Sequence, residues 1–312
     1  MAGCSWLIHA FSTRQGGVNR GLSTGLNLGF TQGAPRARIR KNRKLFLQQL
    51  GAENFALATL QQVHSAIVYQ VRRAAGGELE YRVGGSRVPK QPGLAPPQGD
   101  ALLTDQAGIL LSAKTADCLP VLLADPKRRV VGAVHAGWRG ALARIVEKAA
   151  GEMRRVFGSD PRNLLAVIGP SIRVCCYEVG EEVEEAFHGR FPHADKFFRK
   201  RSKSAASHPE RHSQSLLNMP PGSNPVPKLS THLDLVAVAQ DQLLAAGLSP
   251  RHIAAVDFCT ACRTDLFYSH RHEGSRAGRM MAVIGICPEK PALASCRPPP
   301  THSLPRRGTN CP

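Results

Sequence analysis

Three nearly continuous apolar runs follow one another closely in the middle of this 312-residue chain. They are ILLSAKTA (109–116), LPVLLA (119–124) and VVGAVHA (130–136), and the turn signal Asp125-Pro126 separates the last two. Short runs without polar alternation are typical of strands that are buried on both faces. The sequence therefore predicts a sheet that other layers cover on both sides.

Further helices and strands are expected on both sides of this region. Helical spacing, with Pro35 at the start of the first segment and Gly247 at the end of the last, predicts helices over residues 35–50, 141–157, 178–187 and 233–247. Apolar and β-branched content predicts strands within 57–71, 164–169 and 281–286. The elements alternate without strict βαβ regularity, which indicates a mixed α/β or α+β fold.

Three stretches interrupt this pattern. Residues 82–99 are rich in Gly, Pro and Gln and are expected to form a loop. Residues 199–229 combine Ser, Pro and basic side chains with few apolar ones, which predicts a disordered insertion near 196–230. The Pro-rich end, 288–312, is expected to be a disordered tail. Residues 1–287 are then expected to form one domain.

The chain is strongly basic, with 41 Lys and Arg against 23 Asp and Glu and a formal net charge of +18. Such a balance favours an anionic partner, either nucleic acid or a phosphate-bearing small molecule. Almost half of the excess lies in 195–230 and 288–312, only 5% of the residues are aromatic, and no recognition motif is visible. We therefore expect at most weak nucleic-acid binding, by the basic insertion.

Membrane and secretory signals are absent from the sequence. No apolar run reaches the roughly 18 residues that a membrane crossing needs, and the N-terminal segment MAGCSWLIHAFSTR lacks a basic n-region. Nine cysteines are an odd number, which argues against a disulfide framework and for a reducing compartment. The expected location is the cytoplasm, with no membrane partner and no obligate protein partner.

Three potential metal ligands stand beside apolar segments. They are His64 in QVHS, Cys118 in TADCLP and His135 in VHAGWRG. Two imidazoles and a thiolate suit Zn²⁺, and three protein ligands leave a fourth position open for water or substrate, as in catalytic zinc sites. For each residue alone, the alternative is a buried polar side chain without a ligand role, and the spacing does not decide between them.

Two further motifs keep alternatives open. The segment HAGWRG (135–140) follows a strand and begins a helix, so it is either an anion-binding turn with Arg139 or a plain turn with a solvated Arg139. Cys175 and Cys176 either begin a helix, where the pKa of a thiol falls, or form one buried and one exposed thiol.

The sequence contains a single CxxC motif, Cys259-Thr260-Ala261-Cys262. Together with His270 and His272 it could form a structural zinc knuckle. The spacing differs from that of ordinary zinc fingers and no second CxxC exists in the chain, so the signal for a structural metal is weak.

Several long motifs occur in one order along the chain: AFSTRQGGVNRGLSTGLNLG (10–29), TADCLPVLLAD, VGAVHAGWRG, IGPSIRVCCYEVG and CTACRTDLFYSHRHEGSRAGRMMAVIG. Together they resemble the YfiH-like purine nucleoside phosphorylases, formerly called laccase-domain or multicopper polyphenol oxidase proteins. The resemblance covers roughly residues 8–286, apart from the loop and the insertion.

The resemblance implies a layered α/β/β/α sandwich and a zinc enzyme. It implies phosphorolysis of adenosine, inosine, guanosine or methylthioadenosine and hydrolytic deamination of adenosine. The zinc ligands would be His64, Cys118 and His135. Candidate contacts to nucleoside or phosphate are Arg14, Asn27, Arg43, Tyr177 and Arg279.

Catalytic roles are expected for Asp117, Cys118 and Arg139. Asp117 would either shuttle a proton during deamination or orient a metal ligand. Basic residues such as Arg43, Arg139 and Arg279 would hold phosphate by charge-assisted hydrogen bonds. A copper phenol oxidase is the alternative enzyme, but a multicopper site needs several His-x-His pairs and the chain offers only His270 and His272.

Overall fold

The computed structural model describes residues 1–312 except 2–3, 22–23, 32–33, 90–94, 203–228 and 289–312. Its strands form three sheets. The largest has the order β14-β10-β8-β9-β6-β3-β4-β5, the second β1-β15-β7-β2 and the smallest β11-β13-β12. The strand bounds in the largest sheet are β3 Val68–Arg73, β4 Leu79–Val83, β5 Ser86–Arg87, β6 Ala101–Thr104, β8 Leu119–Asp125, β9 Val130–Ala136, β10 Leu165–Ile168 and β14 Ile253–Ala255.

The second sheet contains β1 (Leu7–Phe11), β2 (Ala56–Ala58), β7 (Ile109–Thr115) and β15 (Met280–Ile286). The smallest contains β11 (Glu178–Val179), β12 (Phe198–Ser202) and β13 (Leu229–Leu233). The helices are α1 Arg36–Gln49, α2 Trp138–Leu142, α3 Ile145–Phe157, α4 Glu181–His188, α5 Leu235–Ala245 and α6 His270–Glu273.

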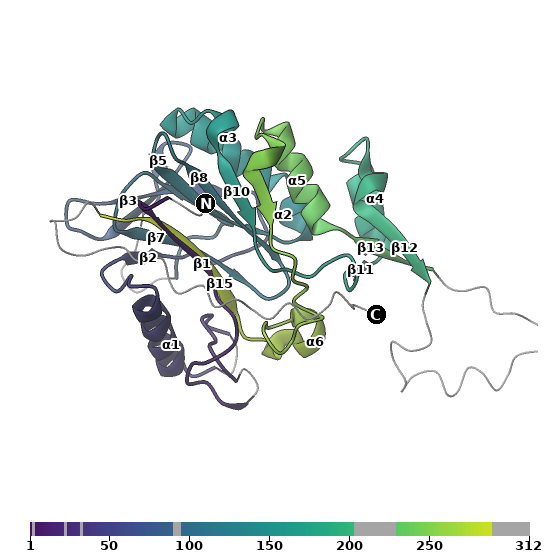
Figure 1. The fold of residues 1–312 in the computed structure, drawn as a ribbon, viewed down its shortest axis with the longest axis horizontal. Helices are drawn as coiled ribbons and strands as arrows, with labels where there is room; N and C mark the ends of the chain where they lie inside the picture. Colours follow the sequence, from purple (N-terminus) through teal and green to yellow (C-terminus); the bar gives the residue numbers. More distant parts are fainter. Residues whose placement is uncertain (2–3, 22–23, 32–33, 90–94, 203–228, 289–312) are drawn as a thin grey trace, which may run out of the picture.

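The two larger sheets pack face to face and a helical layer covers each outer face. Leu102 and Leu122 of the eight-stranded sheet contact Leu111 and Ile284 of the four-stranded sheet. The opposite side chains of the large sheet, such as Leu123, pack against α3 and α5. Figure 1 shows α3 and α5 above the sheets and α1 below them. The predicted α/β/β/α layering is therefore confirmed.

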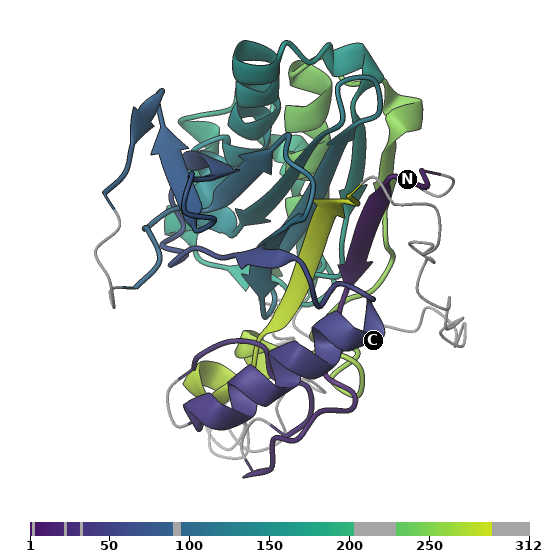
Figure 2. The same ribbon diagram turned by 90° about the vertical axis from the view of Figure 1, so that its left-hand side faces the viewer.

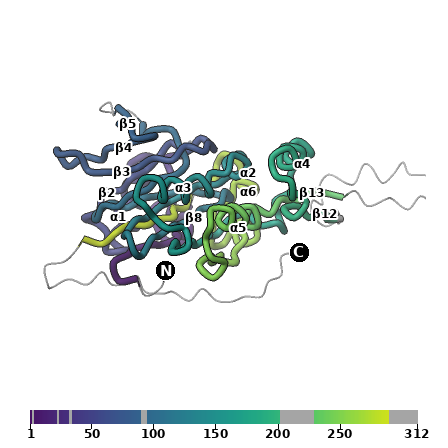
Figure 3. The backbone as a smooth tube through the Cα atoms, turned by 90° about the horizontal axis from the view of Figure 1, so that it is seen from above, coloured from purple at the N-terminus to yellow at the C-terminus, as the bar shows by residue number. Residues whose placement is uncertain are grey.

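The outer face of the four-stranded sheet packs on α1. Phe46 of α1 shares a core cluster with Leu110 and Val283. In Figure 2, α1 crosses beneath the neighbouring strands β1 and β15, which pair antiparallel. Figure 3 shows that β3, β4 and β5 lie toward one end of the molecule, whereas α4, β12 and β13 lie toward the other.

The three central runs form strands as predicted, at 109–115, 119–125 and 130–136. Two predicted elements are shorter than expected. The segment 57–71 contains only the ends of two strands, with a loop between them, and the segment 82–99 begins with the β4–β5 hairpin. The turn at Gly84 and Gly85, both with positive φ, permits that hairpin.

The predicted helix over 141–157 is divided. Arg144 adopts a left-handed conformation with φ 62°, so the chain forms α2 and then α3 rather than one helix. The helix predicted at 178–187 begins only at Glu181, because Glu178 and Val179 pair with β13. The helix predicted at 233–247 begins after Asp234, whose carboxylate accepts hydrogen bonds from two backbone N–H groups of its first turn.

The prediction of a disordered insertion over 196–230 was wrong at both of its ends. Phe197 is buried, and β12 pairs with β13 from Phe198 opposite Leu233 to Ser202 opposite Leu229. Phe197, Phe198 and Leu233 are buried, and this burial explains why the ends of the predicted insertion are ordered. The rest of the insertion and the predicted tail beyond Pro288 lie outside the described residues. Among the helices that the structure describes, none is long and apolar enough to cross a membrane.

Candidate functional site

The fold brings together the three predicted metal ligands. Cys118 immediately precedes β8 and His135 lies near the end of β9, and these strands pair antiparallel with Pro120 opposite His135. His64 comes from the loop between β2 and β3 and has φ 60°. His64 Nε2 lies 3.6 Å from Cys118 Sγ, and one donor atom from each of the three residues lies within 4.8 Å of the others.

A buried carboxylate orients two of these ligands. Asp100 Oδ1 lies 2.8 Å from His135 Nδ1 and accepts the backbone N–H of His64 at 3.1 Å. Its other oxygen accepts both the backbone N–H and the hydroxyl of Ser65, each at 2.6 Å. When Nδ1–H of a neutral His135 ring donates to Asp100, Nε2 carries the lone pair that can bind a metal. Metal-binding histidines commonly use this arrangement.

The charges at the site favour a thiolate. Burial opposes ionisation of Cys118, but the neighbouring His135 outweighs it and lowers the pKa of the thiol to about 6. Burial also opposes protonation of His135, yet Cys118 and Asp100 raise its pKa to about 9. Burial likewise disfavours the charged form of Asp100, but hydrogen bonds from His135 and Ser65 lower its pKa. These shifts pair a Cys118 thiolate with a protonated His135. A borderline metal such as Zn²⁺ would displace that proton and take one thiolate and two imidazoles as ligands.

Gly137 leaves the space that these ligands occupy. A Cβ atom at this position would lie 2.5 Å from His64 Cδ2 and 3.1 Å from Cys118 Sγ. Because its φ of −77° is ordinary for any residue, the requirement for glycine comes from this close approach. The VHAGWRG motif therefore needs glycine at this position because a side chain would clash with His64 and Cys118.

The three ligands line a pocket of about 510 Å³ that also contains basic and aromatic side chains. Lys114 and Arg279 line it, as does the exposed ring of Phe30. Burial and the nearby Arg43 and Arg279 lower the pKa of Lys114 to about 8. The pocket therefore combines a metal-ligand set with positive charge that suits an anion.

The predicted substrate contacts fall into two groups. Arg279 lines the pocket, and Arg43 stacks on Phe30 with its guanidinium carbon 4.5 Å from the ring centroid. Asn27 is fully buried, and its Oδ1 accepts the backbone N–H groups of Gly29 and Arg279, so it shapes the pocket wall.

Arg14 and Tyr177 are placed differently from Arg279. Arg14 forms an ion pair with Glu273 at 3.0 Å and stacks on Tyr268. Its guanidinium is therefore engaged by other residues of the fold. Tyr177 is half-buried, and burial followed by the charge of Cys118 raises its pKa. Neither side chain is part of the pocket lining.

Asp117 is buried next to Cys118, and its carboxylate is already engaged. It accepts hydrogen bonds from Thr260 Oγ1 at 2.6 Å, Ser269 Oγ at 3.1 Å and Arg271 N at 2.7 Å. This arrangement suits a positioning role more than proton transfer. Arg139 is exposed on α2, with its guanidinium carbon 4.2 Å from the ring centroid of Trp138.

Sequence reasoning missed Phe30 and two ionisable residues of this site. Asp100 stands directly before the buried strand β6, and Lys114 is a lone cation within the apolar run of β7. An ionisable residue in or beside a buried strand must find a partner or a function, and that signal was available in the sequence.

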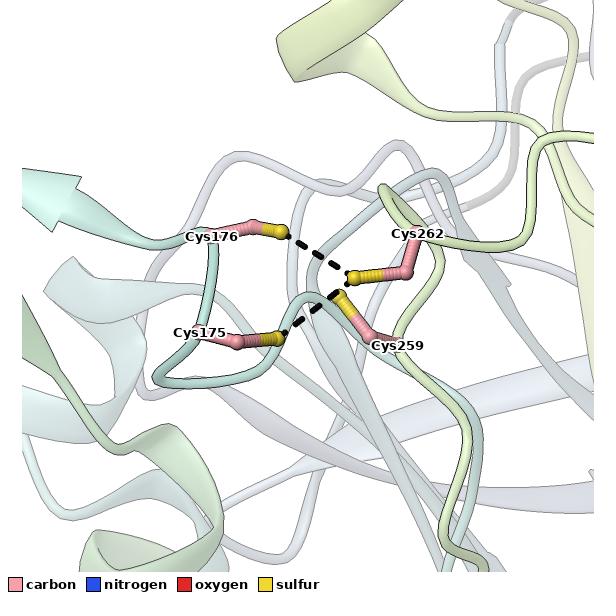
Figure 4. Close-up of side chains that lie close together, drawn as sticks. All are labelled: Cys175, Cys176, Cys259 and Cys262. Atoms are coloured by element: carbon pink, nitrogen blue, oxygen red, sulfur yellow. Dashed lines mark hydrogen bonds between the residues drawn. The ribbon is translucent and has the colours of Figure 1, made fainter. Parts of the chain in front are cut away.

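A second group of possible metal ligands consists of cysteines alone. Cys175, Cys176, Cys259 and Cys262 converge from two turn segments (Figure 4). Both alternatives for Cys175 and Cys176 were wrong, because the two residues lie in a turn before β11 and both are half-buried. Hydrogen bonding to Cys175 and Cys259, together with burial, raises the pKa of Cys176 instead of lowering it.

The histidines of the suggested zinc knuckle do not join the cysteines. His270 and His272 lie on α6, and the cysteine group contains neither. Cys262 and Cys287 are each disulfide-bonded, whereas the sequence predicted no disulfide framework. Cysteine counts carry no information on which sulfur atoms meet in the fold.

Known proteins are similar to this chain in sequence and fold. Residues 8–287 match the family described as multi-copper polyphenol oxidoreductase laccase. A purine nucleoside phosphorylase of Deinococcus radiodurans is 34% identical over 279 residues, which cover 89% of this chain and 88% of the relative. Adenosine deaminase RL5, from an unknown prokaryotic organism, is 31% identical over 283 residues, covering 89% and 93% of the two chains.

Solved structures lead to the same family. The Bacillus licheniformis hypothetical protein YfiH superposes with a TM-score of 0.72 at 28% identity, covering 90% of this chain and 92% of that one. YlmD from Geobacillus stearothermophilus gives 0.71 at 28% identity, with 92% and 94% covered. The chain therefore belongs to the YfiH-like family, the one described as multi-copper polyphenol oxidoreductase laccase.

Proposed function

We propose that this protein is a zinc-dependent purine nucleoside enzyme. Its reactions would be phosphorolysis of adenosine, inosine, guanosine or methylthioadenosine and hydrolytic deamination of adenosine. The observation that carries the proposal is one pocket that joins His64, Cys118 and His135 to the cations Lys114 and Arg279. The names of the relatives, purine nucleoside phosphorylase and adenosine deaminase, support the same chemistry.

Zn²⁺ would be held by His64, Cys118 and His135, and when bound it would supply Lewis-acid chemistry to the pocket. Asp100 would keep the His135 ring oriented, since it holds Nδ1 at 2.8 Å. The lowered pKa of Cys118, about 6, keeps the ligand as a thiolate near neutral pH.

In phosphorolysis, a phosphate oxygen attacks C1′ of the ribose while the C1′–N9 bond breaks. The electron pair of that bond passes to the purine, which takes up a proton and leaves as the free base, and ribose 1-phosphate remains. Lys114 and Arg279 would hold the phosphate by charge-assisted hydrogen bonds, with Arg43 contributing positive charge behind Phe30. The Phe30 ring, 44% exposed, would stack on the base.

In deamination, water adds to C6 of adenosine and ammonia leaves, which gives inosine. Asp117 would act as a positioning residue, since three donors occupy its carboxylate. Arg139 and Tyr177 would shape the surroundings of Cys118 rather than contact phosphate directly, because neither lines the pocket. Arg14 and Asn27 would hold the loops around the pocket.

Copper phenol oxidation is the second candidate, because the family description names it. Among the described residues, the metal-ligand groups contain only two histidines in total, His64 and His135. A trinuclear copper cluster needs several His-x-His pairs. This donor inventory favours a single zinc at the pocket over a multicopper centre.

The proposal also includes a cytoplasmic location and nucleosides and phosphate as the partners, with no obligate protein partner. Weak nucleic-acid binding would be confined to the basic insertion at 196–230. A gel shift that loses its salt-sensitive band when residues 203–228 are deleted would support that assignment.

The test uses the purified full-length chain with and without a tight zinc chelator. Adenosine, inosine, guanosine and methylthioadenosine are each incubated with and without phosphate, and the products are separated by chromatography. Phosphate-dependent release of free base, or zinc-dependent conversion of adenosine to inosine, is the expected result. A folded, zinc-loaded protein without turnover of any of the four would overturn the proposal.

A further inference from the structure

Four sulfur atoms meet at a place that the proposed nucleoside chemistry does not use. Cys175 and Cys176 lie in the turn before β11, and Cys259 and Cys262 lie between β14 and α6. Figure 4 shows their side chains pointing toward one another from these two segments. Cys262 Sγ lies 3.6 Å from Cys175 Sγ and 3.3 Å from Cys176 Sγ.

The sulfur spacing is that of a metal–thiolate site. All four Sγ atoms lie within 4.8 Å of one another. Four sulfurs at the usual Zn–S distance of about 2.3 Å in a tetrahedron are about 3.8 Å apart. The Sγ atoms of Cys175, Cys176 and Cys259 need only small shifts to reach this spacing.

We propose that Cys175, Cys176 and Cys259 form a second metal site for a thiophilic cation, with Zn²⁺ as the expected occupant. All three are free thiols. Cys262 is disulfide-bonded, and the proposal does not depend on it, because three thiolates and one further donor complete a tetrahedral shell. The site is separate from the His64–Cys118–His135 set.

The surroundings of the sulfurs suit thiolate ligands. The backbone N–H of Arg173 donates to Cys259 Sγ at 3.4 Å, and such bonds stabilise negative charge on metal-bound sulfur. The Arg173 side chain donates to the carbonyls of Val256 and Phe258, and Arg201 donates to the carbonyl of Cys175 at 2.9 Å. Two guanidinium groups thus bring positive charge to a site that would hold three thiolates.

The location gives the metal a structural role. It would join segment 171–177 to segment 258–263, which are already linked by the Thr260 N–H to the Ser171 carbonyl at 3.0 Å. Thr260 in turn donates to Asp117, the neighbour of Cys118, at 2.6 Å. A metal at the cysteines would hold in place the segment that positions the wall of the catalytic site.

Metal content of the full-length protein tests the proposal. The chain is expressed with zinc, purified with a phosphine reductant and analysed by elemental mass spectrometry. We expect two zinc ions per wild-type chain, one in the double variant His64→Ala/Cys118→Ser, one in Cys175→Ser/Cys176→Ser, and none in the combined variant. Cys4→Ser, which removes a free thiol outside both groups, is the matched control and should keep two.

Cobalt substitution provides a readout in a variant that keeps every cysteine of the group. In His64→Ala/Cys118→Ser, bound Co²⁺ should give an intense sulfur-to-cobalt charge-transfer band, which Cys259→Ser should remove or strongly weaken. One zinc per wild-type chain that disappears completely in His64→Ala/Cys118→Ser, or absence of the cobalt–thiolate band in that variant, would overturn the proposal.

Discussion

The two groups of metal-ligand residues differ in donors and surroundings. The His64–Cys118–His135 set mixes nitrogen with sulfur, lines a pocket of about 510 Å³ and is oriented by a buried carboxylate. The cysteine group offers sulfur alone and joins two turn segments. Mixed donors beside a pocket leave room for a substrate, whereas several thiolates that join two segments suit a structural metal. We therefore expect chemistry at the first group and structural support from the second.

Removal of the mixed-donor ligands should have the largest effect. In each of His64→Ala, Cys118→Ala and His135→Ala, nucleoside turnover should fall by about 1,000-fold or more, because a bound metal contributes several kcal/mol to the transition state. Steady-state assays with free-base release measure this. Cys175→Ser should retain most turnover, and equal losses in all four variants would remove the distinction between the two groups.

A methyl group at Gly137 should have the next largest effect. Gly137→Ala places Cβ against His64 and Cys118, which displaces a ligand, and a displacement of about 1 Å can cost about 100-fold in rate. Gly151→Ala in α3 is the matched control, because nothing lies within 4 Å of its Cβ position and alanine favours a helix. Turnover of Gly137→Ala equal to that of Gly151→Ala would show that this contact is unimportant.

Asp100→Asn should weaken metal binding at the mixed-donor site by about 10–100-fold, the usual range for a residue that orients a ligand. Competition with a chromophoric chelator measures the affinity. The exposed Asp265, which pairs with Arg263, supplies the control Asp265→Asn. The cysteine site should keep its affinity in both variants, and a parallel loss at both sites would indicate general destabilisation.

The pH dependence of the KM for phosphate should follow the protonation of Lys114. Its pKa is lowered to about 8, so the side chain is charged below that pH and loses its charge above it. The KM for phosphate should therefore rise above pH 8, by up to about tenfold per pH unit if this proton is required. Lys114→Arg keeps its charge and should flatten the rise. A profile identical in both enzymes would exclude Lys114 from phosphate binding.

Loss of the cysteine site should have the smallest effect on turnover. In Cys175→Ser we expect a kcat within about threefold of wild type, because no cysteine of this group lines the pocket, together with a lower Tm in zinc-containing buffer. Loss of a structural metal removes folding free energy. Thermal unfolding with and without chelator measures it. An unchanged Tm would contradict the structural role.

The layered core was predictable because its pattern is local. Each apolar run of β7, β8 and β9 is visible in a few consecutive residues. The three ligands of the pocket were predictable from motifs, although the contact between His64 and Cys118 joins residues 54 positions apart. Asp100 was missed because its partners come from two other segments, and the split of α2 from α3 depends on one left-handed residue, Arg144.

The cysteine group could not be predicted for the same reason. Cys175 and Cys262 are 87 positions apart. The pair Cys175-Cys176 and the pair Cys259-Cys262 are each a weak motif when taken alone. Only the pairing of β10 with β14, which places Ile168 beside Ala255, brings the following turns together. Register between distant strands is a tertiary property that the local pattern does not contain.

The position of β15 has a consequence for synthesis of the protein. This last strand lies between β1 and β7 in the four-stranded sheet, and all seven of its residues are buried. A nascent chain that lacks it presents two unpaired strand edges, each able to pair with another chain. The sheet can therefore be completed only after residue 286 has left the ribosome, and termination before β15 would yield an aggregation-prone product rather than a smaller folded protein.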